Sequence, residues 1–571
     1  MKPTLSALCV LASLISLAGC GTSPQAGLPP AQSPDAERAR YIGTEHPFAS
    51  EAVYFVVTDR FVDGDPGNNY PEESGWDRPL RWENGDTANV GYLGGDWQGI
   101  LNNTDYIREM GFTSVWITPI VENPSEAFNG GTPITQGSIG TDRGKSGYHG
   151  YWGVNFYRED KHWGSQGLNF RQFTAAMREQ GLGTVLDIVL NHGSPAYSMD
   201  PPQPLFGQLY DGQGDLVADH QNLAPQALDP EHNPLHAFFR NQPDLAQLAD
   251  MDERKPEVMD YFVGAYLQWI EQGASAFRID TVKHIDAASW GTFAARIREQ
   301  HPEFFMFGEV YDYSAEGIAP YTYEPFGGMS VLDFPMKAAL GEVFEQGRGF
   351  DTLLPTLKLE QRLYANPYEL TTFYDNHDMP RLNADDNGFI DAHNWLFTAR
   401  GIPVVYYGSE MGFMRGKAEH SGNRNYFGQE RVEQARTHPI RQQLMAIARV
   451  RQATPALQRG VQLNLSFEQD TAAFYRVLQD GEQAQTALVL LNKGDEPAAF
   501  TVREYLQAGG WQEQLGGEWV TIEPGTVLET QVPAHGVKVF VRNGTVEGAA
   551  LNAELARLMA LRDGILVSGE R

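Results

Sequence analysis

The stretch Ala276-Phe-Arg-Ile-Asp-Thr-Val-Lys-His284 contains a short, mostly apolar run that leads into an acid and then two basic residues. Seven other short runs rich in β-branched and aromatic residues occur at Val53–Val57, Ser114–Thr118, Thr184–Val189, Phe304–Gly308, Met329–Leu332, Leu370–Tyr374 and Pro403–Tyr407. Helical stretches such as Val258–Gln272 and Ala287–Gln300 fall between these runs. Eight alternating strand and helix units predict an α/β fold in which parallel strands form a (β/α)8 TIM-type barrel.

The rest of the 571-residue chain divides into further units. We expect the barrel over residues 48–454, with a small inserted domain at 192–250, because a structureless loop that long is uncommon in a compact domain. Alternation in Val537-Lys-Val-Phe-Val-Arg542 and the run Thr486–Leu491 predict an antiparallel β-sandwich over 455–545. Leucines at helical spacing in Glu547–Ile565 predict that residues 546–571 form a terminal helix and tail.

The first residues resemble a processing signal. Lys2 precedes a mostly apolar run that ends in Leu17-Ala-Gly-Cys20, which is similar to the cleavage box of bacterial lipoproteins. We expect residues 1–20 to be a signal peptide and lipobox with Cys20 lipidated; the alternative is a plain secretory peptide with an incidental cysteine. Gly21 favours the outer membrane, with the periplasmic or external face left open. Pro-, Ser- and Gly-rich residues 21–47 predict a flexible tether, so only the lipid anchor contacts the membrane.

Composition narrows the classes of partner. The chain has 43 Lys and Arg against 73 Asp and Glu, a formal net charge of −30. This charge repels phosphate backbones and argues against a nucleic-acid partner, whereas a neutral ligand is compatible with it. Cleavage of the signal would remove Cys9, so the mature chain is expected to lack disulfides. We expect a monomer.

Acids, histidines and an arginine are concentrated where predicted strands end. The third strand contains Asp187 and leads to Asn191-His192, and the fourth leads into Arg278-Ile-Asp280. Glu309 follows the fifth strand, and Asn376-His-Asp378 follows the seventh. A single Asp after a strand is usually a helix cap. Several carboxylates converging on the functional end of one barrel indicate catalysis instead.

Four segments resemble, in order, the motifs of glycoside hydrolase family 13, the α-amylase family: Asp187-Ile-Val-Leu-Asn-His192, Phe277-Arg-Ile-Asp-Thr-Val-Lys-His284, Phe307-Gly-Glu-Val310 and Phe373-Tyr-Asp-Asn-His-Asp378. Four further stretches are similar to cyclodextrin glucanotransferases and bacterial α-amylases: Phe55-Val-Val-Thr-Asp-Arg-Phe61, Gly94-Gly-Asp-Trp-Gln-Gly-Ile100, Tyr148-His-Gly-Tyr-Trp152 and Thr372–Arg381. The resemblance runs from about Phe48 to Arg542 and implies an enzyme that acts on α-1,4-linked glucans.

The resemblance also implies the roles of individual residues in a retaining mechanism. Asp280 is the implied nucleophile, Glu309 the acid/base with a raised pKa, and Asp378 the third acid that binds sugar hydroxyls. Arg278 points to the same face of its strand as Asp280 and should keep that acid ionised. Other implied substrate-binding residues are His149, Tyr151, Asp187, His192, Lys283, His284, Tyr311, His377 and Arg381. Lys283 and His284 could instead only cap the following helix.

A second constellation predicts calcium. Asp63-Gly-Asp-Pro-Gly-Asn-Asn69 alternates oxygen ligands with turn-forming residues, which suits Ca²⁺, although such a loop can also be a cluster of Asx turns. It resembles the calcium loop of the glucanotransferase branch, which implies Asp63, Asp65, Asn68, Asn69, Gly94 and Asp96 as ligands. Asn191 resembles a ligand of another calcium site in the family, where Asp200 and the backbone of His284 are expected to join it.

The acceptor, water or a second sugar, is harder to predict. Glucanotransferases place a large aromatic residue in the inserted domain, and the nearest stretch here, Gly214–Asn222, has none. They also carry further C-terminal modules that we do not expect here, and both absences favour hydrolysis. We therefore expect endo-hydrolysis of α-1,4 bonds in starch, glycogen or maltooligosaccharides. The alternatives are a disproportionating or cyclodextrin-forming glucanotransferase, a cyclodextrin or maltodextrin hydrolase, and a non-catalytic glucan-binding lipoprotein.

Overall fold

The computed structural model describes residues 39–138 and 140–564, and from Arg40 onward these form one compact unit. The predicted signal peptide, Cys20 and residues 565–571 of the predicted tail lie outside the described residues. Among the described helices, none combines the length and the hydropathy that a membrane span requires.

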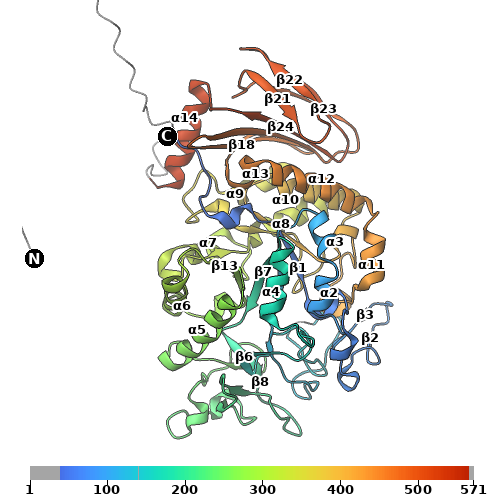
Figure 1. Ribbon diagram of the computed structural model, residues 1–571, viewed down its shortest axis with the longest axis vertical. Helices are drawn as coiled ribbons and strands as arrows, with labels where there is room; N and C mark the ends of the chain where they lie inside the picture. Colours follow the sequence, from blue (N-terminus) through green and yellow to red (C-terminus); the bar gives the residue numbers. More distant parts are fainter. Residues whose placement is uncertain (1–38, 139, 565–571) are drawn as a thin grey trace, which may run out of the picture. The chain divides into compact units, whose positions relative to one another are not determined.

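Eight parallel strands of the described chain form one sheet, in the order β14, β13, β12, β7, β4, β1, β16 and β15. Strands β1, β7 and β13 of this sheet are labelled in Figure 1. Their bounds are Val53–Val56 (β1), Ser114–Ile117 (β4), Gly183–Ile188 (β7), Ala276–Ile279 (β12), Phe305–Gly308 (β13), Ser330–Val331 (β14), Thr371–Thr372 (β15) and Ile402–Tyr406 (β16). A parallel bridge between Leu332 and Thr371 joins the two end strands and closes the barrel. The predicted barrel is confirmed, and each strand end agrees within two residues.

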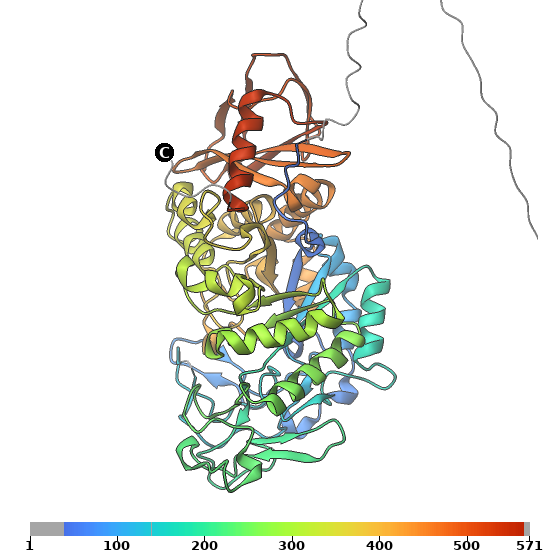
Figure 2. The same cartoon turned by 90° about the vertical axis from the view of Figure 1, so that its left-hand side faces the viewer.

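The barrel strands are buried on both faces, as parallel strands covered by helices must be. Every residue of β1, β4, β12 and β13 is buried. Helices pack around the sheet (Figure 2), among them α4 (Phe170–Glu179), α5 (Pro256–Glu271), α6 (Ala287–Gln300), α8 (Phe334–Phe344), α10 (Asp386–Thr398) and α12 (Pro439–Ala453). Helix α6 begins after Asp286, whose side chain accepts a hydrogen bond from the Ser289 backbone N–H and caps the helix.

Small sheets follow the third barrel strand, where the insertion was predicted. Strands β9 (Gln208–Tyr210) and β10 (Leu216–Asp219) form one antiparallel pair, and β8 (His192–Pro195) pairs with β11 (Leu248–Asp250). The second pair joins the beginning of the insertion to its end. Residues just before β11 are therefore held near the mouth of the barrel, although they lie far along the chain from β7.

The predicted C-terminal antiparallel domain is also present. A six-stranded sheet in the described chain has the order β17 (Val461–Phe467), β18 (Thr471–Asp480), β19 (Gln483–Asn492), β24 (Gly536–Asn543), β21 (Gly509–Glu513) and β22 (Trp519–Ile522); β20 (Ala498–Val502) and β23 (Leu528–Val532) form a separate pair. Helix α14 (Ala549–Arg562) follows, as predicted. The alternation in β24 does not create an exposed face, because Val539 and Phe540 are both completely buried.

Several contacts join this domain to other parts of the compact unit, among them those of Arg476 and Tyr41. Arg476 on β18 donates to the carbonyl groups of Thr398 and Ala399 at the end of α10. Tyr41 forms an antiparallel bridge with Gln479, and its hydroxyl donates to Asn552 Oδ1 at 2.7 Å. The predicted flexible tether is therefore wrong over its last residues, because Tyr41 is buried against the sheet and is part of the fold.

Candidate active site

The side chains predicted to carry the chemistry meet at the carboxyl ends of the barrel strands. The register of β7 and β12 pairs Asp187 with Arg278, so both residues lie at the same height in the barrel. Asp280 follows β12 directly, and Glu309 follows β13. A cavity of ≈ 550 Å³ opens at this end, and it is lined by Asp280, Glu309 and Asp378. The fold therefore brings the three predicted acids together.

Arg278 is completely buried and connects these acids. Its Nη1 donates to Asp187 Oδ1 and to Asp280 Oδ1, each at 2.9 Å, and its Nη2 lies 2.8 Å from Glu309 Oε2. Because one planar guanidinium contacts both Asp280 and Glu309, their carboxyl groups lie close together. This arrangement is consistent with the separation of roughly 5 Å that retaining glycosidases use.

Burial controls the protonation of the acids. Desolvation raises the pKa of Glu309 to about 8, although the nearby Arg278 guanidinium opposes the shift. Glu309 therefore holds a proton at neutral pH, the state in which it can protonate a leaving group. Desolvation also lowers the pKa values of His192 and His377, so both imidazoles are neutral and can accept as well as donate hydrogen bonds.

Asp187 organises the floor of the cavity without lining it. Trp116 Nε1 and the Tyr151 hydroxyl donate to Asp187 Oδ2 at 2.9 Å and 2.7 Å, and desolvation raises the pKa of the carboxyl to about 7. The Tyr151 hydroxyl also lies 2.8 Å from His377 Nε2. Asp187 therefore fixes the orientation of Tyr151 and Arg278, and it does not itself line the cavity.

Of the predicted substrate-binding residues, seven line the cavity: His149, Tyr151, His192, Lys283, His284, Tyr311 and His377. Asp187 and Arg278 lie beneath it. The structure contradicts the prediction for Arg381, which is buried and donates to the carbonyl groups of Tyr407 and Asn423. Its guanidinium connects loops behind the site and does not face the cavity.

A chain of charged residues beside Asp378 was missed, although its members, Asp142, Lys145, Glu419 and Arg424, line the same cavity. Arg424 Nη2 donates to Asp378 Oδ1 at 2.6 Å and also forms an ion pair with Glu419 at 3.0 Å. Glu419 in turn contacts Lys145 Nζ at 3.0 Å, and Lys145 contacts Asp142 at 2.8 Å. These residues lie on irregular loops away from strand ends, so no local pattern marked them. The third acid is held by a network that spans two loops.

The predicted calcium loop contains oxygens that have no hydrogen-bond partner. Asp63 Oδ1, Asn68 Oδ1 and Asn69 Oδ1 are all buried and unpaired. Gly94 packs against Asn69 so closely that a Cβ at position 94 would lie 2.4 Å from Asn69 Oδ1. Unpaired carboxylate and amide oxygens are the ligands that a hard cation requires, so these residues fit Ca²⁺.

Two other predicted ligands of this loop act as caps in the structure. Asp96 accepts backbone hydrogen bonds from Gly64, Asp65 and Gly99 and is the N-cap of α2 (Trp97–Leu101). The Asp65 side chain accepts from the Gly67 backbone N–H. In the described residues no cluster of three or more His, Cys, Asp or Glu could hold a metal. Calcium here would therefore depend on amide oxygens as well as on Asp63.

The second predicted metal site has a different composition. Asn191 Nδ2 donates to Asp244 Oδ2 at 3.0 Å, and His284 Nδ1 lies 3.0 Å from the same carboxylate. Asp200 is exposed and has no hydrogen bond or ion pair with Asn191 or His284, both of them described residues, so its role as a ligand stays a prediction. Asp244 contacts both residues because the pairing of β8 with β11 returns the end of the insertion to the barrel.

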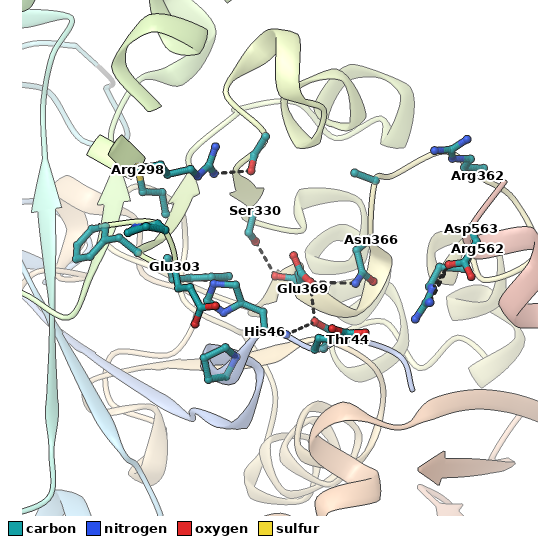
Figure 3. Close-up of a pocket in the computed structure, with 18 residues that line it drawn as sticks. Thr44, His46, Arg298, Glu303, Ser330, Arg362, Asn366, Glu369, Arg562 and Asp563 are labelled. Atoms are coloured by element: carbon teal, nitrogen blue, oxygen red, sulfur yellow. Dashed lines mark hydrogen bonds and ion pairs between the residues drawn. The ribbon is translucent and has the colours of Figure 1, made fainter. Parts of the chain in front are cut away.

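A larger cavity, of ≈ 710 Å³, lies near the amino ends of β13 and β14 (Figure 3). Its lining mixes Arg298, Arg362 and Arg562 with several acids, and Arg562 forms an ion pair with Asp563. Glu369 accepts hydrogen bonds from Thr44 and Asn366. Active sites in this fold lie at the carboxyl ends of the strands, so we assign the chemistry to the smaller cavity.

Comparison with known families identifies the family of this chain. The model of the alpha-amylase catalytic domain matches residues 55–200 and 231–454, which include all three acids of the cavity. The chain belongs to the alpha-amylase family. It is a glycoside hydrolase or transglycosylase acting on α-glucans.

Relatives within the alpha-amylase family have both activities. A cyclomaltodextrin glucanotransferase of Bacillus sp. (strain 38-2) is 28% identical over 544 residues, which cover 91% of this chain and 71% of the relative. An alpha-amylase of Niallia circulans is 30% identical over 400 residues, covering 67% of this chain and 71% of the relative. The chain spans about two thirds of the length of the curated glucanotransferases it matches.

One solved structure changes an argument made from the sequence. The crystal structure of CldA, described as the first cyclomaltodextrin glucanotransferase with a three-domain ABC distribution, has 29% identity and a TM-score of 0.70, covering 87% of this chain and 99% of that one. An alpha-amylase-family transferase can therefore lack further modules. Their expected absence here no longer favours hydrolysis.

Proposed function

We propose that the protein is a retaining endo-hydrolase of α-1,4-glucosidic bonds in starch, glycogen or maltooligosaccharides. The observation that supports this proposal most strongly is the shared contact of Asp280 and Glu309 with Arg278. Protonated Glu309 donates its proton to the glycosidic oxygen while Asp280 attacks the anomeric carbon and forms a glycosyl-enzyme. The Glu309 carboxylate then removes a proton from water, whose oxygen displaces Asp280. Asp378 would bind hydroxyls of the same sugar.

Hydrolysis is favoured over cyclisation by the wall that the insertion contributes. Its residues at the cavity are Leu245, Ala246 and Leu248, together with His192 at its start. The predicted position of that ring, Gly214–Asn222, does not line the cavity, so this prediction was wrong. No insertion residue of the described lining is a Phe, Tyr or Trp, so none offers the large aromatic ring expected of a cyclising enzyme.

We also propose Ca²⁺ as a structural cation held by Asp63, Asn68 and Asn69, whose unpaired oxygens support it. The bound cation would neutralise this loop and hold it against the barrel. A lipid anchor at Cys20 and location at the outer membrane are proposed from the sequence alone.

A product profile from soluble starch tests the proposed activity. We expect new reducing ends and short linear maltooligosaccharides, and Asp280→Asn should abolish them. Cyclic products, or longer chains formed from maltoheptaose without a rise in reducing ends, would instead establish a glucanotransferase. Wild-type protein that binds glucan but produces none of these would be a non-catalytic binding protein.

A further inference from the structure

Trp519 on β22 is exposed to an extent unusual among the tryptophans of this protein. Trp519 is 66% exposed, whereas tryptophans such as Trp97, Trp116 and Trp511 are completely buried. Exposing a large aromatic side chain forgoes the favourable burial of its apolar surface. A fixed, exposed indole therefore calls for an explanation in terms of what it contacts.

A glycine on the neighbouring strand leaves space for the indole. Gly510 on β21 lies beneath it, and a Cβ at that position would come within 2.2 Å of Trp519 Cζ2. The φ angle of Gly510 is not positive, so the backbone does not require glycine there. Its missing side chain instead provides the space in which the ring packs against the strand.

The position of Trp519 follows from the sheet register. Across the strands, Arg476, Ala487, Val541, Gln512 and Trp519 are successive partners and therefore share one face. Exposure increases along this row of partners. Arg476 and Ala487 are completely buried, Val541 is 6% exposed, and Gln512 is exposed. Trp519 thus continues this face onto β22, the outermost strand of the six-stranded sheet.

We propose that Trp519 is the centre of a surface site that binds an α-glucan chain outside the catalytic cavity. Its neighbours on the same face are neutral hydrogen-bonding groups, because Gln512 lies opposite it and Thr521 lies two residues along β22. An aromatic ring beside an amide and a hydroxyl matches a pyranose, which has an apolar face and hydroxyl groups at its edge. Nearby Glu518 and Glu523, and the net charge of −30, oppose anionic lipids and nucleic acids.

The ligand class rests on the α-glucan specificity of the family, and it is independent of whether water or sugar accepts the glycosyl group. One aromatic platform binds a single oligosaccharide weakly. On starch, however, Trp519 and the catalytic cavity can bind the same granule. Linkage of two binding sites increases the apparent affinity by about 10²-fold or more. The site should therefore affect starch and leave short substrates unaffected.

Binding to insoluble starch granules tests the site, with Glu309→Gln as the parent so that the starch is not degraded. We expect Trp519→Ala to weaken granule binding by at least about tenfold. Gly510→Val, which displaces the indole without removing it, should weaken binding similarly. Trp76→Ala is the matched control, because Trp76 is also exposed, at 52%, but lies on a different part of the chain. Thermal unfolding monitored by circular dichroism confirms that each variant folds.

In the active background, Trp519→Ala should keep the wild-type kcat/KM on maltotetraose. Granule binding equal to that of the parent would overturn the proposal, as would an equal loss in Trp76→Ala. Equal losses on granules and on maltotetraose would also overturn it. If the enzyme proves to be a transferase, the proposed function fails but the granule measurement, made without turnover, still decides this site.

Discussion

Arg424 Nη2 donates to Asp378 Oδ1 at 2.6 Å, so the acid expected to bind the reacting sugar is already oriented in the free protein. The same guanidinium donates from Nε to the His377 carbonyl at 2.9 Å. Two donors of one planar group thus fix both the backbone and the side chain of this segment. Groups held this way need little rearrangement when the substrate binds, which favours catalysis.

Replacing Arg424 by lysine should expose this role. Arg424→Lys keeps the charge but loses the planar set of donors that contacts Asp378 and the His377 carbonyl at the same time. We expect kcat to fall by roughly 10- to 100-fold, because a small displacement of Asp378 weakens transition-state binding. Arg431→Lys is the control, since Arg431 donates to the carbonyls of Tyr426 and Phe427 and does not line the cavity. Equal activity of both variants would refute the positioning role.

Lys145 should act through Glu419 in the same network. Lys145→Met removes the buried ammonium and leaves Glu419 with Arg424 as its main cation, which draws the guanidinium away from Asp378. We expect a loss of roughly 3 kcal/mol in stability, because an ion pair is broken in a buried site. We also expect kcat to fall while KM changes little. Urea unfolding and steady-state kinetics measure the two effects, and unchanged kcat in a folded variant would contradict the prediction.

The activity should decline on the alkaline side as Glu309 ionises. Its pKa is raised to about 8 by burial, and only the protonated form donates to the leaving group. The kcat/KM of the wild type should therefore decrease as pH rises through about 8. Glu309→Gln should reduce kcat by roughly 10²- to 10⁴-fold and should bind maltooligosaccharide nearly as the wild type does. An alkaline limb that persists unchanged in the residual activity of Glu309→Gln would assign that limb to another group.

The same shift predicts how stability depends on pH. The pKa of Glu309 is raised from 4.5 in the unfolded chain to about 8 in the fold, so the folded state holds the proton more tightly. This contribution is complete below about pH 4.5 and is lost progressively as pH rises through about 8. Thermal unfolding at several pH values should therefore show Glu309→Gln gaining stability relative to the wild type at alkaline pH. A constant difference between the two proteins would rule out a shifted Glu309.

Chelation should destabilise the protein if Asp63, Asn68 and Asn69 hold calcium. Excess EDTA should lower the Tm of the wild type by roughly 5 °C, because the bound cation stabilises only the folded state. Asp63→Ala should have a lower Tm that no longer responds to EDTA. Asp77→Ala, which removes an exposed acid near the same loop, should respond as the wild type does. A wild-type Tm that EDTA does not change would exclude a stabilising calcium ion.

The barrel could be predicted because its information is local. The run Ala276–Ile279 and helix Ala287–Gln300 were predicted with their observed bounds, since the run is short and mostly apolar and Asp286 caps the helix. The acids at Asp280 and Glu309 follow directly from strand ends, which the fold gathers at one mouth. Elements and acids whose positions depend on a short stretch of neighbouring residues can therefore be predicted from the sequence.

The residues that were missed depend on long-range pairing. Asp244 reaches Asn191 and His284 only because β11 pairs with β8, and nothing in its own stretch indicates this contact. Lys145 and Glu419 meet although they lie 274 residues apart. Arg381 lies within a recognised motif but turns behind the site to bond with backbone carbonyls. A motif therefore indicates which residues belong near the site, whereas the conformation of the loops determines which side chains face the cavity.

The stereochemistry of the first product tests the paired carboxylates most directly. Proton NMR during the first minutes of maltopentaose hydrolysis distinguishes the anomers before mutarotation mixes them. With Asp280 and Glu309 on one guanidinium, cleavage should proceed through two displacements, and the new reducing end should appear as the α-anomer. Initial release of the β-anomer would show a single displacement by water and would contradict the roles assigned to these two acids.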